Sequence, residues 1–157
     1  MKLSLVIPCY NEEGNVQKFY DETIETFNNN VDNYEFIFVD DGSTDKTYHN
    51  LKKLYESHPE SDIQVLSLSR NFGKEAAIYA GLNNATGDLI CLIDADLQQH
   101  PRVVLKMLEV MKSNDETDCV AAYQEIRHES KLMCCFKSMF YKIINKTSHS
   151  DFKNGAS

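Results

Sequence analysis

The sequence predicts an α/β fold in which a mostly parallel sheet carries helices on both faces. Short apolar runs rich in Val, Ile and Leu recur along the chain, and amphipathic segments with helical spacing separate them. Turn-forming residues such as Pro, Gly, Asn, Asp and Ser follow the apolar runs. Strands that are apolar throughout belong to sheets covered on both sides, and their alternation with helices favours parallel pairing.

The predicted elements alternate between strand and helix from the first residues onward. Strands are expected over residues 2–9, 34–39, 63–68, 88–93 and 119–123. Helices are expected over residues 14–29, from a cap at Ser43 or Thr44, through 76–82 and from Pro101 onward. A last segment, 131–146, has apolar residues on one helical face and lysines elsewhere.

Length and composition favour one globular domain over residues 1–157. With 157 residues and 42% hydrophobic content, the chain can bury roughly two-thirds of its unfolded surface. No uninterrupted apolar stretch exceeds five residues, far short of the roughly 20 that a membrane-spanning helix needs.

The five cysteines include no C-x-x-C pair, and we expect Cys9, Cys91 and Cys119 to be buried thiols in a reducing compartment. The net charge of −8 argues against a nucleic-acid partner.

Polar residues gather where three predicted strands end. They are Pro8, Tyr10, Asn11 and Glu12 after the first strand, Asp40 and Asp41 after the second, and Asp94 and Asp96 after the fourth. In open α/β sheets, ligands bind outside the carboxyl ends of the strands, so we expect these side chains to line one pocket. Acids and amides at this position suit a ligand with hydroxyl donors and a phosphate that a metal ion bridges to the protein.

Asp94 and Asp96 are the most informative pair in the chain. In an extended segment, residues i and i+2 point to the same side, so both carboxylates are expected to reach one divalent cation. At roughly 4 Å separation and an effective dielectric of about 20, their repulsion is about 4 kcal/mol, which a bound Mg²⁺ or Mn²⁺ turns into attraction. The alternative is that the two acids are solvated residues of a surface loop.

Other phosphate-binding and signalling patterns do not fit. The sequence has no G-x-G-x-x-G after the first strand and no G-x-x-x-x-G-K-[ST], which argues against a dinucleotide oxidoreductase and a P-loop protein. A receiver-type signalling domain would carry its acid pair after the first strand and a lysine after the fifth. Here Pro8-Cys9-Tyr10 and Tyr123-Gln124 stand at those places.

Four segments, taken together, resemble a known family. They are Val6-Ile7-Pro8-Cys9-Tyr10-Asn11-Glu12-Glu13, Val39-Asp40-Asp41-Gly42-Ser43-Thr44-Asp45, Ser69-Arg70-Asn71-Phe72-Gly73-Lys74 and Asp94-Ala95-Asp96-Leu97-Gln98. In this order and spacing they resemble glycosyltransferase family 2, and within it the polyprenyl-phosphate branch that includes dolichol-phosphate mannose synthase and bactoprenol glucosyltransferases. The resemblance covers essentially the whole chain. It implies the Rossmann-like GT-A fold and a role in cell-wall or polysaccharide biosynthesis.

The resemblance also implies a reaction, in which a hexose is transferred, with inversion, from a UDP- or GDP-sugar to a polyprenyl-phosphate or glycan acceptor. By the same resemblance, the nucleotide-sugar site comprises Pro8, Tyr10, Asn11, Glu12, Asp40, Asp41, Asp94 and Asp96. Asp94 and Asp96 are the expected catalytic residues and, with Gln98, the expected ligands of Mg²⁺ or Mn²⁺. The ammonium of Lys74 adds a positive contact to the donor, although a lysine at a helix start is often simply solvated.

The acceptor side is less defined. A phosphomonoester is mostly dianionic at neutral pH and needs no general base, and no base is evident near the end of the chain. We expect Arg127 and Ser138 to contact the acceptor, while Gln124 stands where the family usually has an arginine. Family members continue past the sequence that ends at Ser157, so we expect a truncated domain. The alternative function is a nucleotide-sugar-binding module without turnover.

The basic segment 131–146 indicates where in the cell the protein could act. A basic amphipathic helix can lie in the surface of an anionic membrane, as an enzyme with a lipid acceptor requires, and it can equally pack on its own sheet. We expect a cytoplasmic protein, peripheral at the cytoplasmic face of the membrane or anchored there by helices that follow the sequence.

Overall fold

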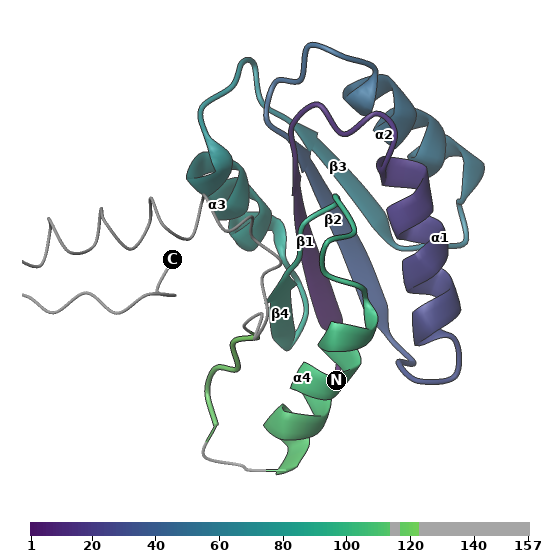
Figure 1. Ribbon diagram of the computed structural model, residues 1–157, viewed down its shortest axis with the longest axis vertical. Helices are drawn as coiled ribbons and strands as arrows, with labels where there is room; N and C mark the ends of the chain where they lie inside the picture. The colour runs from purple at the N-terminus through teal and green to yellow at the C-terminus, as the bar shows by residue number, and fades with distance from the viewer. Residues whose placement is uncertain (114–116, 123–157) are drawn as a thin grey trace, which may run out of the picture. The chain divides into compact units, whose positions relative to one another are not determined.

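The computed structural model describes residues 1–113 and 117–122, and Figure 1 shows their arrangement. The fold is that of the compact unit formed by Met1–Ala121. Strands and helices alternate along it. They are β1 (Leu3–Cys9), α1 (Val16–Phe27), β2 (Tyr34–Asp40), α2 (Thr47–Ser57), β3 (Ile63–Ser67), α3 (Lys74–Asn84), β4 (Leu89–Leu92) and α4 (Arg102–Ser113).

The four strands form one sheet in the order β3-β2-β1-β4, and every neighbouring pair is parallel. β1 and β2 pair along their whole lengths, from Leu3 opposite Tyr34 to Cys9 opposite Asp40. Their carboxyl ends therefore leave the sheet side by side. The predicted α/β fold with a parallel sheet is confirmed.

Helices cover both faces of the sheet, as predicted (Figure 1). On one face, α1, α2 and α4 enclose a core into which alternate residues of β1 and β2 point, among them Leu5 and Phe38. Phe19 of α1 meets the ring of Phe38 edge to face, with 6.2 Å between the ring centroids. On the other face, α3 packs Ala77 against a smaller cluster that includes Val6.

Close packing of α3 requires a small residue at Gly81. A Cβ at this position would collide with the side chain of Val6 and press on that of Val39. The glycine therefore lets the helix approach β1 and β2 closely, which fixes the height of α3 above the sheet.

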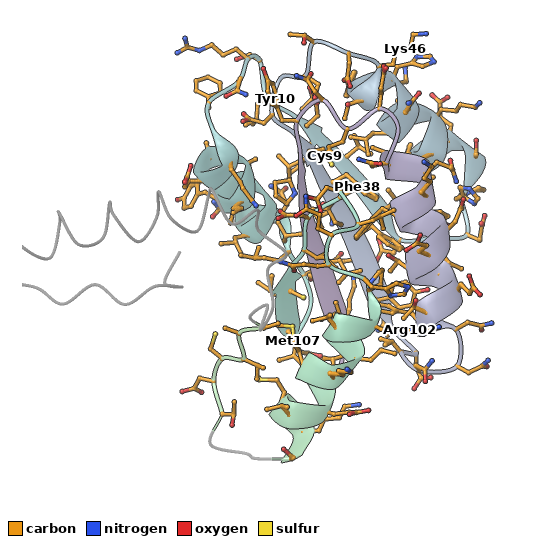
Figure 2. The ribbon with its side chains drawn as sticks, in the orientation of Figure 1. Cys9, Tyr10, Phe38, Lys46, Arg102 and Met107 are labelled. Atoms are coloured by element: carbon orange, nitrogen blue, oxygen red, sulfur yellow. The ribbon has the colours of Figure 1, made fainter. Side chains whose placement is uncertain are left out.

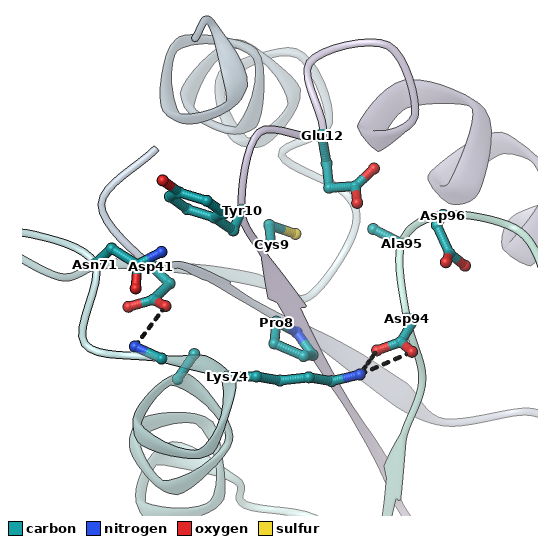
Figure 3. A pocket seen from close by; sticks show the side chains of 12 residues that line it. Pro8, Cys9, Tyr10, Glu12, Asp41, Asn71, Lys74, Asp94, Ala95 and Asp96 are labelled. Atoms are coloured by element: carbon teal, nitrogen blue, oxygen red, sulfur yellow. Dashed lines mark hydrogen bonds and ion pairs between the residues drawn. The ribbon is translucent and has the colours of Figure 1, made fainter. Parts of the chain in front are cut away.

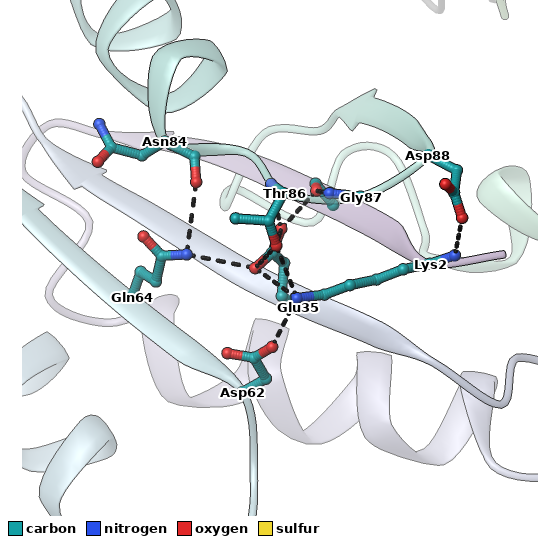
Figure 4. Close-up of polar contacts among 9 residues, drawn as sticks. Lys2, Glu35, Asp62, Gln64, Asn84, Thr86, Gly87 and Asp88 are labelled. Atoms are coloured by element: carbon teal, nitrogen blue, oxygen red, sulfur yellow. Dashed lines mark hydrogen bonds and ion pairs between the residues drawn. The ribbon is translucent and has the colours of Figure 1, made fainter.

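A buried polar network joins the strands at the end of the sheet opposite their carboxyl ends (Figure 4). Glu35 of β2 is 1% exposed, and its carboxylate accepts hydrogen bonds from Ser4 Oγ at 2.6 Å, the Thr86 amide at 2.7 Å and Lys2 Nζ at 2.9 Å. Lys2 Nζ also donates to Asp62 at 2.8 Å. Burial by itself raises the pKa of Glu35, but the hydrogen bonds from Ser4, Lys2 and Thr86 outweigh it and lower the pKa to about 2.

Two sequence predictions about the end of the described chain are wrong. Residues 117–122 form no helix or strand, although a strand was expected from Cys119, and Cys119 is exposed rather than buried. A strand is stable only when it pairs with a neighbour and buries a face, and this short, alanine-containing run makes no ladder with the described sheet. The expected burial of Cys9 and Cys91 is confirmed. The expected helix over 131–146 lies outside the described residues.

Candidate functional site

A pocket of about 250 Å³ lies at the carboxyl ends of β1 and β4, beside the start of α3 (Figure 3). Seven of the residues predicted for the site line it. They are Pro8, Tyr10, Glu12, Asp41, Lys74, Asp94 and Asp96. Parallel strands bring these residues together although they come from four separate segments, which is the convergence that the strand ends predict.

An ion pair crosses this pocket from α3 to the segment after β4. Lys74 Nζ lies 2.6 Å from Asp94 Oδ1 and 2.9 Å from Asp94 Oδ2, so the ammonium contacts both carboxylate oxygens. Lys74 is 56% exposed and Asp94 35% exposed, and Figure 3 shows the lysine side chain extended across the pocket toward the aspartate. The pair is therefore accessible from solvent and to a ligand.

Asp96 does not lie on an extended segment with Asp94, which corrects the premise behind the predicted pair. β4 ends at Leu92, the chain turns at Ala95 and Asp96, and Leu97 adopts a left-handed backbone with φ of 60°. Asp96 Oδ1 accepts a hydrogen bond from the Gln98 amide at 3.0 Å, which closes the turn. In Figure 3 the Asp94 carboxylate points to Lys74 and that of Asp96 points elsewhere.

Asp41 positions the loop that leads into α3. It is 3% exposed, and its two carboxylate oxygens accept hydrogen bonds from the amides of Phe72 at 2.8 Å and Gly73 at 2.9 Å. The next residue, Gly42, has φ of 64°, and a Cβ there would collide with the backbone of Arg70. Asp41 and Gly42 together hold this loop against the end of β2, and Lys74 follows it directly.

Asn11, Asp40 and Gln98 do not line the pocket. Asp40 is buried, and its carboxylate accepts hydrogen bonds from the Ser43 amide and Ser67 Oγ, both at 3.2 Å. Asn11 accepts a hydrogen bond from the Thr44 amide at 2.9 Å. These contacts join the loops after β1 and β2 and so shape the rim.

Glu12 and Tyr10 stand at the mouth of the pocket. Glu12 Oε2 accepts a hydrogen bond from Asn15 Nδ2 at 2.6 Å, and the Glu12 amide donates to Thr47 Oγ1 at 2.7 Å, so the residue is anchored from two sides. Tyr10 is 44% exposed, which leaves its ring available for stacking against a planar group.

Several lining residues were not named as site residues from the sequence. Cys9 also lines the pocket, and burial raises the pKa of its thiol above the ordinary value, which favours the neutral thiol there. Asn71 and Gly73 also line the pocket. They belong to the motif Ser69-Arg70-Asn71-Phe72-Gly73-Lys74, and membership of that motif is the sequence feature that could have identified them as site residues. Arg127 and Ser138 lie outside the described residues.

The pocket residues fit a hard divalent cation that is shared with a ligand. Four carboxylates and one ammonium line the pocket, and carboxylate oxygens are the donors that Mg²⁺ and Mn²⁺ prefer. Within residues 1–113 and 117–122, no three His, Cys, Asp or Glu side chains are grouped closely enough to hold a metal ion by themselves. Mg²⁺ typically binds through one or two carboxylates together with substrate phosphates, so this pocket suits a cation that arrives with a phosphate.

Fold and pocket together define an α/β protein with a pocket at the carboxyl ends of parallel strands. The family model described as glycosyl transferase family 2 matches residues 4–147. The chain therefore belongs to glycosyl transferase family 2, as the sequence motifs suggested.

Curated relatives and a solved structure agree with this assignment. The chain is 39% identical over 154 residues to a putative glycosyltransferase, CsbB, of Bacillus subtilis, a match that covers 98% of this chain and 45% of the relative. It is 37% identical over 144 residues to an undecaprenyl-phosphate 4-deoxy-4-formamido-L-arabinose transferase of Photorhabdus laumondii, covering 92% of this chain and 42% of the relative. The chain thus spans a little under half the length of these curated relatives.

Among solved structures, a mannosyltransferase from Pyrobaculum calidifontis in complex with GDP-Man and Mn²⁺ has the same fold. Its TM-score is 0.61 at 25% sequence identity, over 69% of this chain and 32% of that one. The GT-A fold implied by the sequence motifs is confirmed. No helix in the described part of the chain is both long and apolar enough to cross a membrane.

Proposed function

We propose that this protein transfers a hexose, with inversion, from a nucleotide-sugar to a polyprenyl-phosphate or glycan acceptor, and that transfer depends on Mg²⁺ or Mn²⁺. The observation that carries the proposal is the pocket at the ends of β1 and β4 of this glycosyl transferase family 2 chain, where Lys74 pairs with Asp94, and Asp96 also lines the wall. We further propose that residues 1–157 belong to one glycosyltransferase domain.

The donor site follows from the shape and charge of the pocket. We assign the nucleoside to the side formed by Pro8, Tyr10 and Glu12, where an exposed ring can stack and a carboxylate can accept from hydroxyl groups. The diphosphate belongs between Lys74 and Asp94. An anion in a pocket with four carboxylates is repelled unless positive charge accompanies it, which supports the dependence on a cation.

The proposed ligands of the cation are Asp94, Asp96 and Gln98, and the Asp96 carboxylate would have to turn from its present direction to share a cation with Asp94. When bound, the cation would supply charge that stabilises the nucleoside diphosphate leaving group. The protein's own groups orient the donor. Lys74 contacts the phosphates, and Asp41 holds the loop that carries it. Asn11 and Asp40 support the rim around the nucleoside from outside the pocket lining.

In the transfer step, an oxygen of the acceptor attacks the anomeric carbon on the face opposite the leaving group. The new carbon–oxygen bond forms as the bond to the nucleoside diphosphate breaks, so the configuration inverts. A phosphate acceptor needs no general base, because it is mostly dianionic at neutral pH. The name of the Photorhabdus laumondii relative supports such an acceptor. Arg127 and Ser138 remain the proposed acceptor contacts.

The second candidate is a nucleotide-sugar-binding module without turnover. The observation in its favour is that the chain matches only 45% of the length of one relative and 42% of the length of another. An acceptor site can lie in the part of these relatives that the chain does not match. For either candidate, we propose that the protein acts at the cytoplasmic face of a membrane, with the basic segment 131–146 toward the lipid or with helices beyond residue 157 as an anchor.

Binding and transfer experiments separate the two candidates. Calorimetric titration with UDP- and GDP-sugars, with and without Mn²⁺, should reveal one nucleotide class that binds only with the cation. The same donor, radiolabelled in the sugar and mixed with polyprenyl phosphate in detergent, should then label the lipid phase. Binding without labelling favours the module, and failure of every nucleotide to bind contradicts both.

A further inference from the structure

In the structure Lys74 contacts Asp94, whereas its proposed role requires it to contact the phosphates of the donor. Its ammonium lies against both oxygens of Asp94, at 2.6 Å and 2.9 Å, and these are the oxygens that a cation would use (Figure 3). A carboxylate has about four lone-pair sites, but an ammonium on both of its oxygens repels a divalent cation at the same place, so the two compete for Asp94. Either a cation enters and the lysine leaves, or the ion pair stays closed.

The backbone at the start of α3 is fixed, whereas the lysine side chain can move. Asp41 holds the amides of Phe72 and Gly73, and Lys74 is the first residue of the helix. The side chain of Lys74 is 56% exposed, so four flexible methylene groups carry its charge from a fixed point. When the ammonium of Lys74 leaves Asp94, only the lysine side chain therefore has to move, and the backbone of α3 stays in place.

A displaced ammonium needs a new anionic partner, and a diphosphate in the same pocket is the partner that the proposed donor supplies. Lys74 is the only lysine or arginine among the described residues that line the pocket. The nearby Arg70 is directed to the ring of Phe72, with its guanidinium carbon 4.7 Å from the ring centroid. The described part of the pocket therefore offers one ammonium for two tasks, to neutralise Asp94 before binding and to contact phosphate after it.

We propose that Lys74 is a positioning residue that couples the two ligands. It occupies Asp94 in the free protein, which weakens cation binding without nucleotide, and it turns to the donor diphosphate when cation and nucleotide bind together. This inference deepens the proposed function and rests on its cation-dependent donor binding. By linkage, nucleotide must strengthen cation binding by the same factor by which the cation strengthens nucleotide binding.

Titrations of Mn²⁺ into the 157-residue chain test the coupling, with free Mn²⁺ followed by its electron paramagnetic resonance signal. They are run alone and with saturating UDP or GDP, whichever binds. For Lys74→Met we expect Mn²⁺ alone to bind about fivefold more tightly than to wild type, because an exposed ion pair no longer competes. Nucleotide binding in the presence of Mn²⁺ should weaken about tenfold, because a charged contact to phosphate is lost.

Two further variants sharpen the test. Lys74→Arg keeps the positive charge, so its affinity for Mn²⁺ alone should stay close to that of wild type. Lys52→Met removes a lysine of α2 that pairs with Glu56 outside the pocket, and it should change neither titration. Thermal unfolding of each variant shows that it is folded before it is titrated.

Opposite shifts of the two affinities in Lys74→Met support the inference, since a merely structural lysine would weaken both. Equal affinity of wild type and Lys74→Met for Mn²⁺ alone, with strong coupling between Mn²⁺ and nucleotide in both proteins, overturns the inference and leaves the proposed function standing. If neither protein binds Mn²⁺ even with UDP or GDP, the cation-dependent function itself is overturned, and the inference with it.

Discussion

The carboxylate of Asp41 accepts the Gly73 amide at 2.9 Å, which ties the end of β2 to the residue before α3 across 32 positions of sequence. The second oxygen of Asp41 accepts the Phe72 amide at 2.8 Å, so the whole carboxylate serves this loop. Asp41, which the family resemblance predicts to be a donor-site residue, thus also supports the loop before Lys74.

Asp41→Asn should destabilise the fold and weaken donor binding together. The amide side chain offers one acceptor in place of two and turns an N–H group toward a backbone N–H, so we expect a loss of about 1–3 kcal/mol in the free energy of unfolding. Urea unfolding and a nucleotide titration measure the two effects. Asp21→Asn is the control, because this exposed residue of α1 contacts only Gln17 among the described side chains. A stable Asp41→Asn variant with weakened binding would assign Asp41 to the ligand rather than to the loop.

Asp96→Ala should abolish the stabilisation that Mn²⁺ and nucleotide bring together, and it should leave the unliganded fold intact. In the described structure Asp96 makes one hydrogen bond, to the Gln98 amide at 3.0 Å, so its removal costs little stability. A ligand at 100 times its dissociation constant stabilises wild type by about 2.7 kcal/mol. A thermal-shift series with Mn²⁺ and each nucleotide checks this. An unchanged shift in the variant would refute the metal role of Asp96.

Glu35 should make stability depend on acid pH. Its pKa is lowered from 4.5 to about 2 in the folded protein, so the folded state favours the ionised carboxylate. This contribution is fully present above the unfolded value of 4.5 and disappears as pH falls from there toward 2. The shift corresponds to about 3 kcal/mol at neutral pH.

Urea unfolding of wild type and Glu35→Gln over a pH series measures this contribution. The stability difference between the two proteins should be large at pH 7 and shrink as pH falls from about 5 toward 2. Glu56→Gln is the control, because the only partner of this exposed glutamate among the described residues is Lys52, at 3.8 Å. A stability difference that stays constant through the acid range would show that ionisation of Glu35 is not its source.

Gly81→Ala should destabilise the protein although alanine favours helices. The added methyl group collides with Val6, and relief requires α3 to move away from β1, which costs about 1–3 kcal/mol. Gly14→Ala is the matched control, because no atom of residues 1–113 or 117–122, other than those of Gly14 and its two chain neighbours, lies within 4 Å of a Cβ built there. Chemical unfolding of both variants gives the comparison. A neutral Gly81→Ala would mean that α3 can shift on the sheet without loss.

Most of the sheet was predictable because its strands are local apolar runs with turn residues after them. The predicted strand 34–39 differs from β2 by one residue, and the predicted strand 63–68 differs from β3 by one residue. The prediction failed at Cys119, where a similar apolar run has no strand beside it in the described sheet. An apolar run shows that a segment is able to form a strand, whereas pairing decides whether it does.

The sequence by itself determined the family, the α/β fold and the end of the sheet where the pocket lies, because these follow from motif order and from periodicities of two and 3.6 residues. Only the tertiary structure decided which groups meet inside the pocket. Lys74 and Asp94 stand 20 positions apart, and their pairing depends on where the Asp41-held loop sets α3 above β1. The turn after Ala95 likewise directs Asp96 away from its neighbour. Such contacts are long-range, and they depend on packing that no local pattern encodes.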